Sequence, residues 1–135
     1  MPTYSEAVID MIDFFDTQWA SRTLVLQGTD DPRDIPNDSF VRFNFLHTVG
    51  NQASIGSPNA NIFRSFGIIT IQVFNPQSNY GIKVRDFASA ILELYNGTVD
   101  SEIHYYNARV NEVGNDGNGF NQSNVVIEFY YDNIT

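Results

Sequence analysis

The chain has 135 residues, of which 42% are hydrophobic and 14% aromatic, and this composition is typical of one globular domain rather than of a disordered chain. It contains no cysteine, which excludes disulfides, thiol catalysis and cysteine-ligated zinc. Its net charge of −9 argues against nucleic-acid binding, because such a surface repels phosphate.

The N-terminal segment predicts an amphipathic helix over residues 4–19. Its hydrophobic residues recur at spacings of three and four, namely Tyr4, Val8, Met11, Ile12, Phe15 and Trp19. Thr3 or Ser5 is placed to cap the helix start. The segment lacks the pattern of a signal peptide, and no stretch is apolar enough to span a membrane. The absence of cysteine favours an intracellular protein.

Three strands are expected after this helix. Residues 22–28 predict a short strand, and residues 29–38, with two prolines and four aspartates, predict a loop. Residues 39–49 alternate between two faces, the first with Val41, Phe43 and Phe45 and the second with Arg42 and Asn44. Residues 50–61 are small and polar without periodicity, which predicts a long loop of functional type.

The third strand, within residues 63–76, has one apolar face and one mixed face. The apolar face has Gly67, Ile69, Ile71 and Val73, and the mixed face has Phe66, Ile68, Thr70, Gln72 and Phe74. We expect the apolar face to lie in the core. Pro76 has no backbone N–H and should end the strand. Half-exposed aromatic residues on second faces indicate partner contacts or helix cover, namely Phe40, Phe66, Phe74 and Tyr130.

The C-terminal half predicts a second helix and a hairpin. Residues 79–97 carry a helical stripe that ends at Asn96-Gly97, and residues 102–113 and 123–132 predict strands joined by a turn rich in Asn and Gly. We therefore expect a single α+β domain over residues 1–135. Its two layers are a mainly antiparallel twisted sheet of about five strands and two helices on one face.

Catalytic and metal-binding patterns are scarce. His47 and His104 lie in predicted strands, and neither has a second ligand at metal-binding spacing. No Gly-x-Ser-x-Gly elbow is present, although a triad assembled from distant positions stays open. The turn at residues 114–122 departs from an EF-hand because Phe120 stands where an oxygen ligand is needed. We expect a protein that is not an enzyme and has no cofactor and no metal.

One segment carries a family resemblance. "FRSFGIITIQVFNPQSNYGIKVRDFASAILELY" resembles the signature of the tail terminator (minor tail) proteins of long-tailed bacteriophages. The family pattern begins with an aromatic residue or Arg and then a Gly, which correspond to Arg64 and Gly67. An alternating strand follows at residues 69–74. The pattern then has a Pro stop, here Pro76, and a Gly before a helix, here Gly81. Ala88, Ile91 and Tyr95 follow in that helix. The loop "NPQSNYG" is longer and less glycine-rich than the family pattern.

The resemblance implies a structural virion protein with a fold similar to that of tail tube proteins. Such proteins form a homohexameric ring on the head-proximal end of the tail, stop tube polymerisation and provide the head-docking surface. The implied partners are the tail tube protein and a head completion or connector protein. DNA would pass through the lumen without specific binding, and assembly would take place in the host cytoplasm without a membrane.

Three groups of residues are candidates for these contacts. The candidate assembly surface comprises Arg42, Asn44, Thr70, Gln72 and Phe74. The candidate inter-subunit or tube-contact loop comprises Val49, Asn51, Gln52, Ser54, Ile55, Ser57 and Asn59. Residues 1–39 hold 8 of the 16 acidic residues but only 2 of the 7 basic ones, and the candidate acidic lumen takes Asp10, Asp13, Asp30, Asp31 and Asp34.

Two alternatives remain open at the level of sequence. The chain could be the tail tube subunit or the head–tail joining (completion) protein of the same particle, and tube proteins share the expected sheet topology. It could also be a small ligand-binding or enzymatic α+β domain, which would need a concave pocket with convergent polar groups. The acidic residues would then be a solvated surface that aids solubility.

Overall fold

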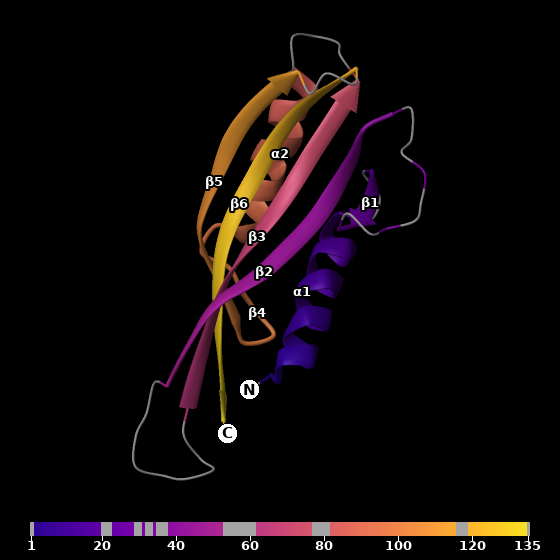
Figure 1. The fold of residues 1–135 in the computed structure, drawn as a ribbon. Helices are drawn as coiled ribbons and strands as arrows, with labels where there is room; N and C mark the ends of the chain where they lie inside the picture. The colour runs from indigo at the N-terminus through magenta and orange to yellow at the C-terminus, as the bar shows by residue number, and fades with distance from the viewer. Residues whose placement is uncertain are drawn as a thin grey trace.

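A computed structural model of the chain describes residues 2–19, 23–28, 31, 34, 38–52, 62–76, 82–115 and 119–134. Two helices and six strands lie within these residues (Figure 1). In chain order they are α1 (Tyr4–Trp19), β1 (Leu24–Gln27), β2 (Phe40–Gln52), β3 (Ile62–Pro76), α2 (Ile82–Tyr95), β4 (Val99–Asp100), β5 (Ile103–Asn115) and β6 (Phe120–Ile134).

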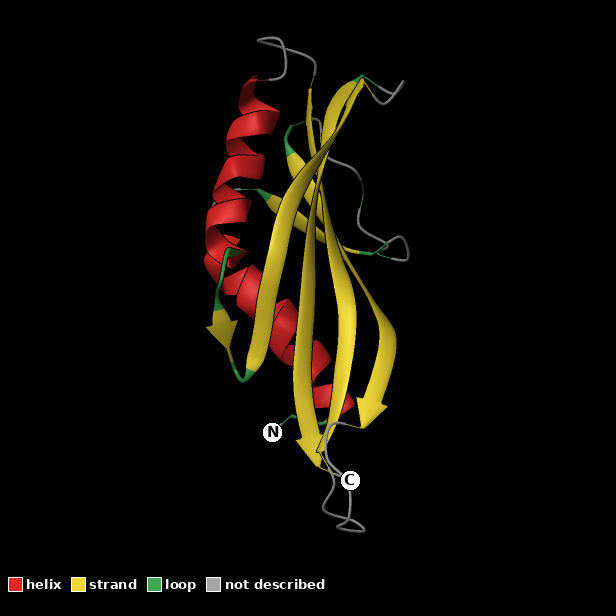
Figure 2. Ribbon diagram, turned by 90° about the vertical axis from the view of Figure 1, so that its left-hand side faces the viewer, coloured by secondary structure: helices red, strands yellow, loops and turns green. Residues whose placement is uncertain are grey.

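The strands form one sheet in the order β1-β2-β3-β6-β5-β4. Figure 2 shows both helices on the same side of this sheet, so the prediction of an α+β domain with two helices on one face is confirmed. We call the side that carries α1 and α2 the helix-covered face and the opposite side the uncovered face. On β3 the former has Gly67, Ile69, Ile71 and Val73, and the latter has Phe66, Ile68, Thr70, Gln72 and Phe74.

Two details of the predicted sheet need correction. It has six strands within the described residues, because the two-residue strand β4 pairs with the start of β5. It is also mixed, since β1 runs parallel to β2 in the register Leu24↔Phe40 to Gln27↔Phe43. Short connections favoured antiparallel neighbours, but the segment between β1 and β2 is long enough to return the chain to the end where β1 began.

Helix α1 has the predicted bounds and the predicted type of cap. The backbone N–H of Glu6 donates to the Thr3 hydroxyl, and the N–H of Thr3 donates to the Glu6 carboxylate, both at 3.3 Å. This reciprocal pair is a capping box. The buried stripe is centred on Ala7, Met11, Phe15 and Trp19. Tyr4, at the helix start, is 59% exposed and was wrongly placed in that stripe.

The predicted assignment of the two faces of β3 is confirmed. Ile69, Ile71 and Val73 are fully buried, whereas the alternate residues of the strand are half-buried. Gly67 is required by close packing, because a Cβ there would lie 2.5 Å from the backbone oxygen of Leu46 and 2.3 Å from the Phe129 ring. Pro76 is the last residue of β3, as predicted.

The C-terminal half also follows the prediction in outline. Helix α2 ends at Tyr95, and Gly97 has the positive φ of 72° that suits a helix stop. Strands β5 and β6 form an antiparallel hairpin that is longer than expected, with pairing out to Asn115↔Asn121. No helix within the described residues is long and apolar enough to cross a membrane.

Helix α1 contacts elements at both edges of the sheet. The Gln27 amide of β1 donates to Asp16 of α1 at 3.3 Å. At the opposite edge, Asp13 of α1 and Asp100 of β4 line one small cleft of about 200 Å³. Because β1 and β4 are the two ends of the strand order, the sheet must curl around the helix. The aromatic side chains of α1 fill the space inside the curl.

Candidate functional site

The residues of the candidate assembly surface lie together on the uncovered face. The β2–β3 register pairs Arg42 with Gln72 and Asn44 with Thr70, so four of the five are two adjacent cross-strand pairs. The Asn44 amide donates to the Gln72 side chain at 3.5 Å. The guanidinium of Arg42 donates to the backbone oxygen of Gly28, which fixes the Arg42 side chain near the end of β1.

Phe74, the fifth residue of that surface, belongs to a cluster of three phenylalanines. Its ring stacks on Phe40 with centroids 4.6 Å apart, and the Phe120 ring packs edge-on against both. Phe40 is only 2% exposed, so its prediction as a half-exposed residue was wrong. Cross-strand stacking on Phe74 accounts for part of this burial, and sequence alternation does not show which rings face each other.

A second group on the uncovered face was not predicted as a unit. The register aligns His104 of β5, Tyr130 of β6 and Phe66 of β3 in one row across the sheet. The His104 and Tyr130 rings stack almost parallel with centroids 4.5 Å apart, and the Arg64 guanidinium lies 4.7 Å from the centre of the Tyr130 ring. All four side chains are half-buried and therefore remain available to a partner.

An ion pair lies beside this row, at the next cross-strand pair on the same face of β3 and β6. The guanidinium of Arg64 donates two hydrogen bonds to the carboxylate of Asp132, at 2.7 and 3.0 Å. These bonds lower the pKa of Asp132 and raise the pKa of Arg64, because each favours the charged form. On the same face, Arg109 and Glu128 form a looser ion pair, with 3.5 Å between the guanidinium nitrogen and the carboxylate oxygen. The uncovered face thus combines aromatic rings, amides and paired charges.

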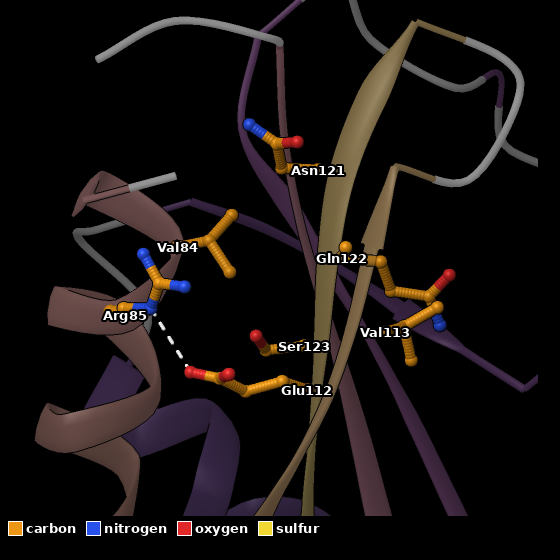
Figure 3. A pocket seen from close by; sticks show the side chains of 8 residues that line it. Val84, Arg85, Glu112, Val113, Asn121, Gln122 and Ser123 are labelled. Atoms are coloured by element: carbon orange, nitrogen blue, oxygen red, sulfur yellow. Dashed lines mark hydrogen bonds and ion pairs between the residues drawn. The ribbon is translucent and has the colours of Figure 1, made fainter. Parts of the chain in front are cut away.

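A pocket of about 340 Å³ lies between the start of α2 and the paired ends of β5 and β6 (Figure 3). An ion pair of 3.0 Å between Arg85 and Glu112 spans one side of it. Ser123, almost fully buried, and Asn121 contribute polar groups from β6. No histidine is among its described lining residues, and the Glu112 carboxylate is bound to Arg85. The arrangement offers hydrogen bonds to a polar segment rather than a nucleophile with its base.

The residues of the candidate contact loop are divided between strand and undescribed chain. Val49, Asn51 and Gln52 belong to β2 and pair with Phe66, Arg64 and Phe63, so their prediction as loop residues was wrong. A register shift between His47 and Val49 lets the strand continue past the point where regular alternation stops. The other four, Ser54, Ile55, Ser57 and Asn59, lie outside the described residues.

The candidate lumen residues do not form one surface. Asp10 and Asp13 line the cleft that α1 shares with Asp100 of β4. Asp31 lies at the opposite edge, where its carboxylate accepts the backbone N–H of Gln27 at 2.7 Å. Asp34 is exposed, and Asp30 lies outside the described residues. The helix-side acids are thus separated from the candidate assembly surface by the thickness of the sheet.

The two histidines lie on opposite faces. His104 stacks on Tyr130 of the uncovered face, whereas His47 joins the Tyr131 hydroxyl on the helix-covered face at 2.8 Å. Burial lowers the pKa of His47 below its ordinary value. The described parts of the chain contain no group of three His, Asp or Glu side chains that could hold a metal ion.

Comparison with protein-family models and with curated proteins finds no match for this sequence. Among the members of the candidate site, the row of His104, Tyr130 and Phe66 was the one that sequence reasoning missed. Phe66 and Tyr130 were both noted as aromatic residues on second faces, but their shared row depends on the β3–β6 register between distant segments.

Proposed function

We propose that the chain is a tail terminator of a long-tailed bacteriophage, a structural subunit that forms a hexameric ring at the head-proximal end of the tail tube. The observation that carries this proposal is the uncovered face. Both helices lie on the other side, so half-buried aromatic and amide side chains remain on a broad sheet surface. Association with further subunits would cover such a face, and exposed apolar patches on small domains usually mark contacts of this kind.

The resemblance of residues 63–95 supports the same proposal. In the fold this segment contains β3, a strand flanked on both sides, and α2, which packs against the sheet. The Gly of the family pattern corresponds to the close contact at Gly67. Its alternating strand corresponds to the two faces of β3, and its Pro stop to the end of β3 at Pro76.

The charge also suits a ring through which DNA passes. Six copies at −9 each would carry about −54, which disfavours adhesion of DNA to the ring. The same charge opposes ring formation, so apolar and hydrogen-bonded contacts on the uncovered face must offset it, helped by salt screening. We expect ring formation to strengthen as the salt concentration rises, because screening weakens the repulsion between subunits.

The test is assembly on tail tubes from the phage that encodes the chain. Native mass spectrometry should detect a hexamer, alone or after docking, and electron microscopy should show one ring at one end of each tube. Extended tubes formed by the chain alone would favour the tube subunit instead. A chain that binds neither tubes nor itself would contradict the proposal.

A matched pair of variants locates the contact. Gln72→Asp adds one negative charge to the uncovered face, whereas Ser89→Asp adds the same charge to the exposed side of α2. We expect the first variant to fold but to lose ring formation, and the second to retain it. Equal loss in both would show that total charge, and not this face, controls assembly.

A further inference from the structure

The first turn of α1 is stabilised by one hydrogen-bonded pair within the turn and by one ring contact to β2. Thr3 and Glu6 close the capping box through two hydrogen bonds of 3.3 Å. Tyr4, although 59% exposed, places its ring against the imidazole of His47 with centroids 4.6 Å apart. Pro2, just before the helix, and Ala7, one turn farther along, are both buried, so Tyr4 is an exposed ring between two packed positions.

His47 lies in a cage of aromatic rings beneath this turn. Phe45, Phe129 and Tyr131 surround its ring, with centroids between 5.4 and 6.4 Å away. Its Nε2 is joined to the Tyr131 hydroxyl at 2.8 Å. Of the side chains packed around it, Tyr4 of α1 is the most exposed, so the Tyr4 ring is the one that moves aside at the lowest cost.

Protonation of this imidazole finds no opposite charge among the described contacts. The titratable groups that face it are the hydroxyls of Tyr4 from α1 and Tyr131 from β6, and neither is a carboxylate. Burial is the cause that lowers the pKa of His47 below 6.5, and no carboxylate acts against it. A charged His47 also lies near a helix start, where the helix dipole disfavours positive charge.

We propose that the first turn of α1 is an acid-sensitive latch, closed by Tyr4 on the imidazole of His47 and by the Thr3–Glu6 capping box. Protonation of His47 favours the open turn, because water can then reach the imidazolium. Protonation of Glu6 removes the charge that accepts the capping bond. The two protonations act on the same turn at different pH, so the latch loosens in two steps.

The direction of both steps follows from the pKa shifts of Glu6 and His47. Hydrogen bonds from the side chain and the backbone of Thr3 lower the pKa of Glu6 below 4.5, and burial lowers the pKa of His47 below 6.5. A group with a lowered pKa in the closed state stabilises that state above its ordinary pKa. The His47 contribution is therefore lost as the pH falls below 6.5, and the Glu6 contribution as it falls below 4.5.

Hydrogen exchange measured by mass spectrometry on the whole chain tests this latch. Exchange in the peptide covering the first turn is compared with exchange in α2 at pH 7.5, 5.5 and 4.0, so that the intrinsic pH dependence cancels. We expect the ratio to rise at each step. At the first step the rise is at most about tenfold for each unit by which the pKa of His47 is lowered.

Two variants separate the steps. His47→Phe keeps a ring against Tyr4 but does not titrate, so the rise between pH 7.5 and 5.5 should vanish. Glu6→Gln keeps a residue that closes capping boxes and should abolish the rise between pH 5.5 and 4.0. A rise of equal size in wild type and in His47→Phe would overturn the latch, as would equal loss of protection in α2.

A second measurement does not depend on the variants folding. In a proton NMR titration, the ring signals of Tyr4 should shift together with the ring signals of His47, at a pH below 6.5. Tyr4 signals that stay constant through the His47 titration would show that the two rings are not coupled. This outcome bears on the latch alone, since ring assembly is measured separately.

Discussion

The two faces of the sheet differ in what buries them. On the helix-covered face, aromatic residues of α1 and α2 reach the strands, and Ile69, Ile71 and Val73 lose all contact with solvent. On the uncovered face, a side chain is shielded mainly by its cross-strand neighbours, so Thr70 and Gln72 stay half-buried. One strand therefore carries a face that stabilises the fold and a face that remains free for association.

The largest expected effect comes from a charge on the covered face. Ile71→Asp should prevent folding, because an unpaired buried carboxylate costs several kcal/mol out of a typical total of about 5–15 kcal/mol. Gln72→Asp, one residue along, should leave a folded chain. Circular dichroism and the yield of soluble monomer compare the two. The assignment of the faces fails if both variants lose the fold equally.

The next effect is steric. Gly67→Ala should lower the free energy of unfolding by about 2–3 kcal/mol, because the new Cβ would meet a backbone oxygen that cannot move aside at low cost. Gly50→Ala in β2 is the matched control, since a Cβ at that position would meet nothing within 4 Å among the described atoms beyond its chain neighbours. Urea denaturation of both variants measures the difference, and a Gly67→Ala protein as stable as wild type would contradict the packing described for β3.

A smaller effect on the free energy of unfolding has opposite signs at two tyrosines of the helix-covered face. Tyr131→Phe removes the hydroxyl bound to His47 and should destabilise the fold by about 1 kcal/mol. The hydroxyl of Tyr105 is buried and has no hydrogen-bond partner within the described structure, so Tyr105→Phe should stabilise the fold by a similar amount, about 1 kcal/mol. Thermal melts of the two variants should move in opposite directions, and a shift in the same direction would count against this interpretation of the two hydroxyls.

The smallest effect belongs to the uncovered face. Asp132→Asn removes the ion pair with Arg64, which is 40% exposed, and should cost about 0.5 kcal/mol at neutral pH. Because the pKa of Asp132 is lowered below 3.8, the difference from wild type should be present above that pH and vanish as the pH falls through the lowered value. A difference that persisted in acid would show that packing, and not charge, is lost.

Much of the fold could be predicted because local patterns control it. The bounds of α1, the two faces of β3 and the stop at Gly97 each follow from spacing or from a residue with special backbone preferences. The parallel pairing of β1 could not be predicted, since it depends on the path of residues 28–39. Strand β4 was missed because its turn consists of Ser101 and Glu102, both with positive φ, where Gly, Asn or Asp is usual.

The candidate site was predictable only in part. Alternation placed Arg42, Asn44, Thr70, Gln72 and Phe74 on second faces, and the register then made them neighbours. Alternation could not place Phe40 under a partner ring or align His104 with Tyr130. Those contacts join different strands, and only the registers of the β2–β3 and β5–β6 pairs determine them.

The order of the strands has a consequence for biosynthesis. Strand β3 pairs with β6, and β6 leaves the ribosome after every other strand of the sheet. Helix α1 leaves before all the strands, yet its Tyr4 packs on His47, which is bound to Tyr131 of β6. The sheet is therefore incomplete until β6 has emerged. Until then, the backbone N–H and C=O groups on one edge of β3 lack their partners in the sheet. Non-local pairing of this kind folds slowly and exposes the chain to aggregation. Truncation within β6 should therefore harm folding yield more than an equal truncation in a domain that folds sequentially.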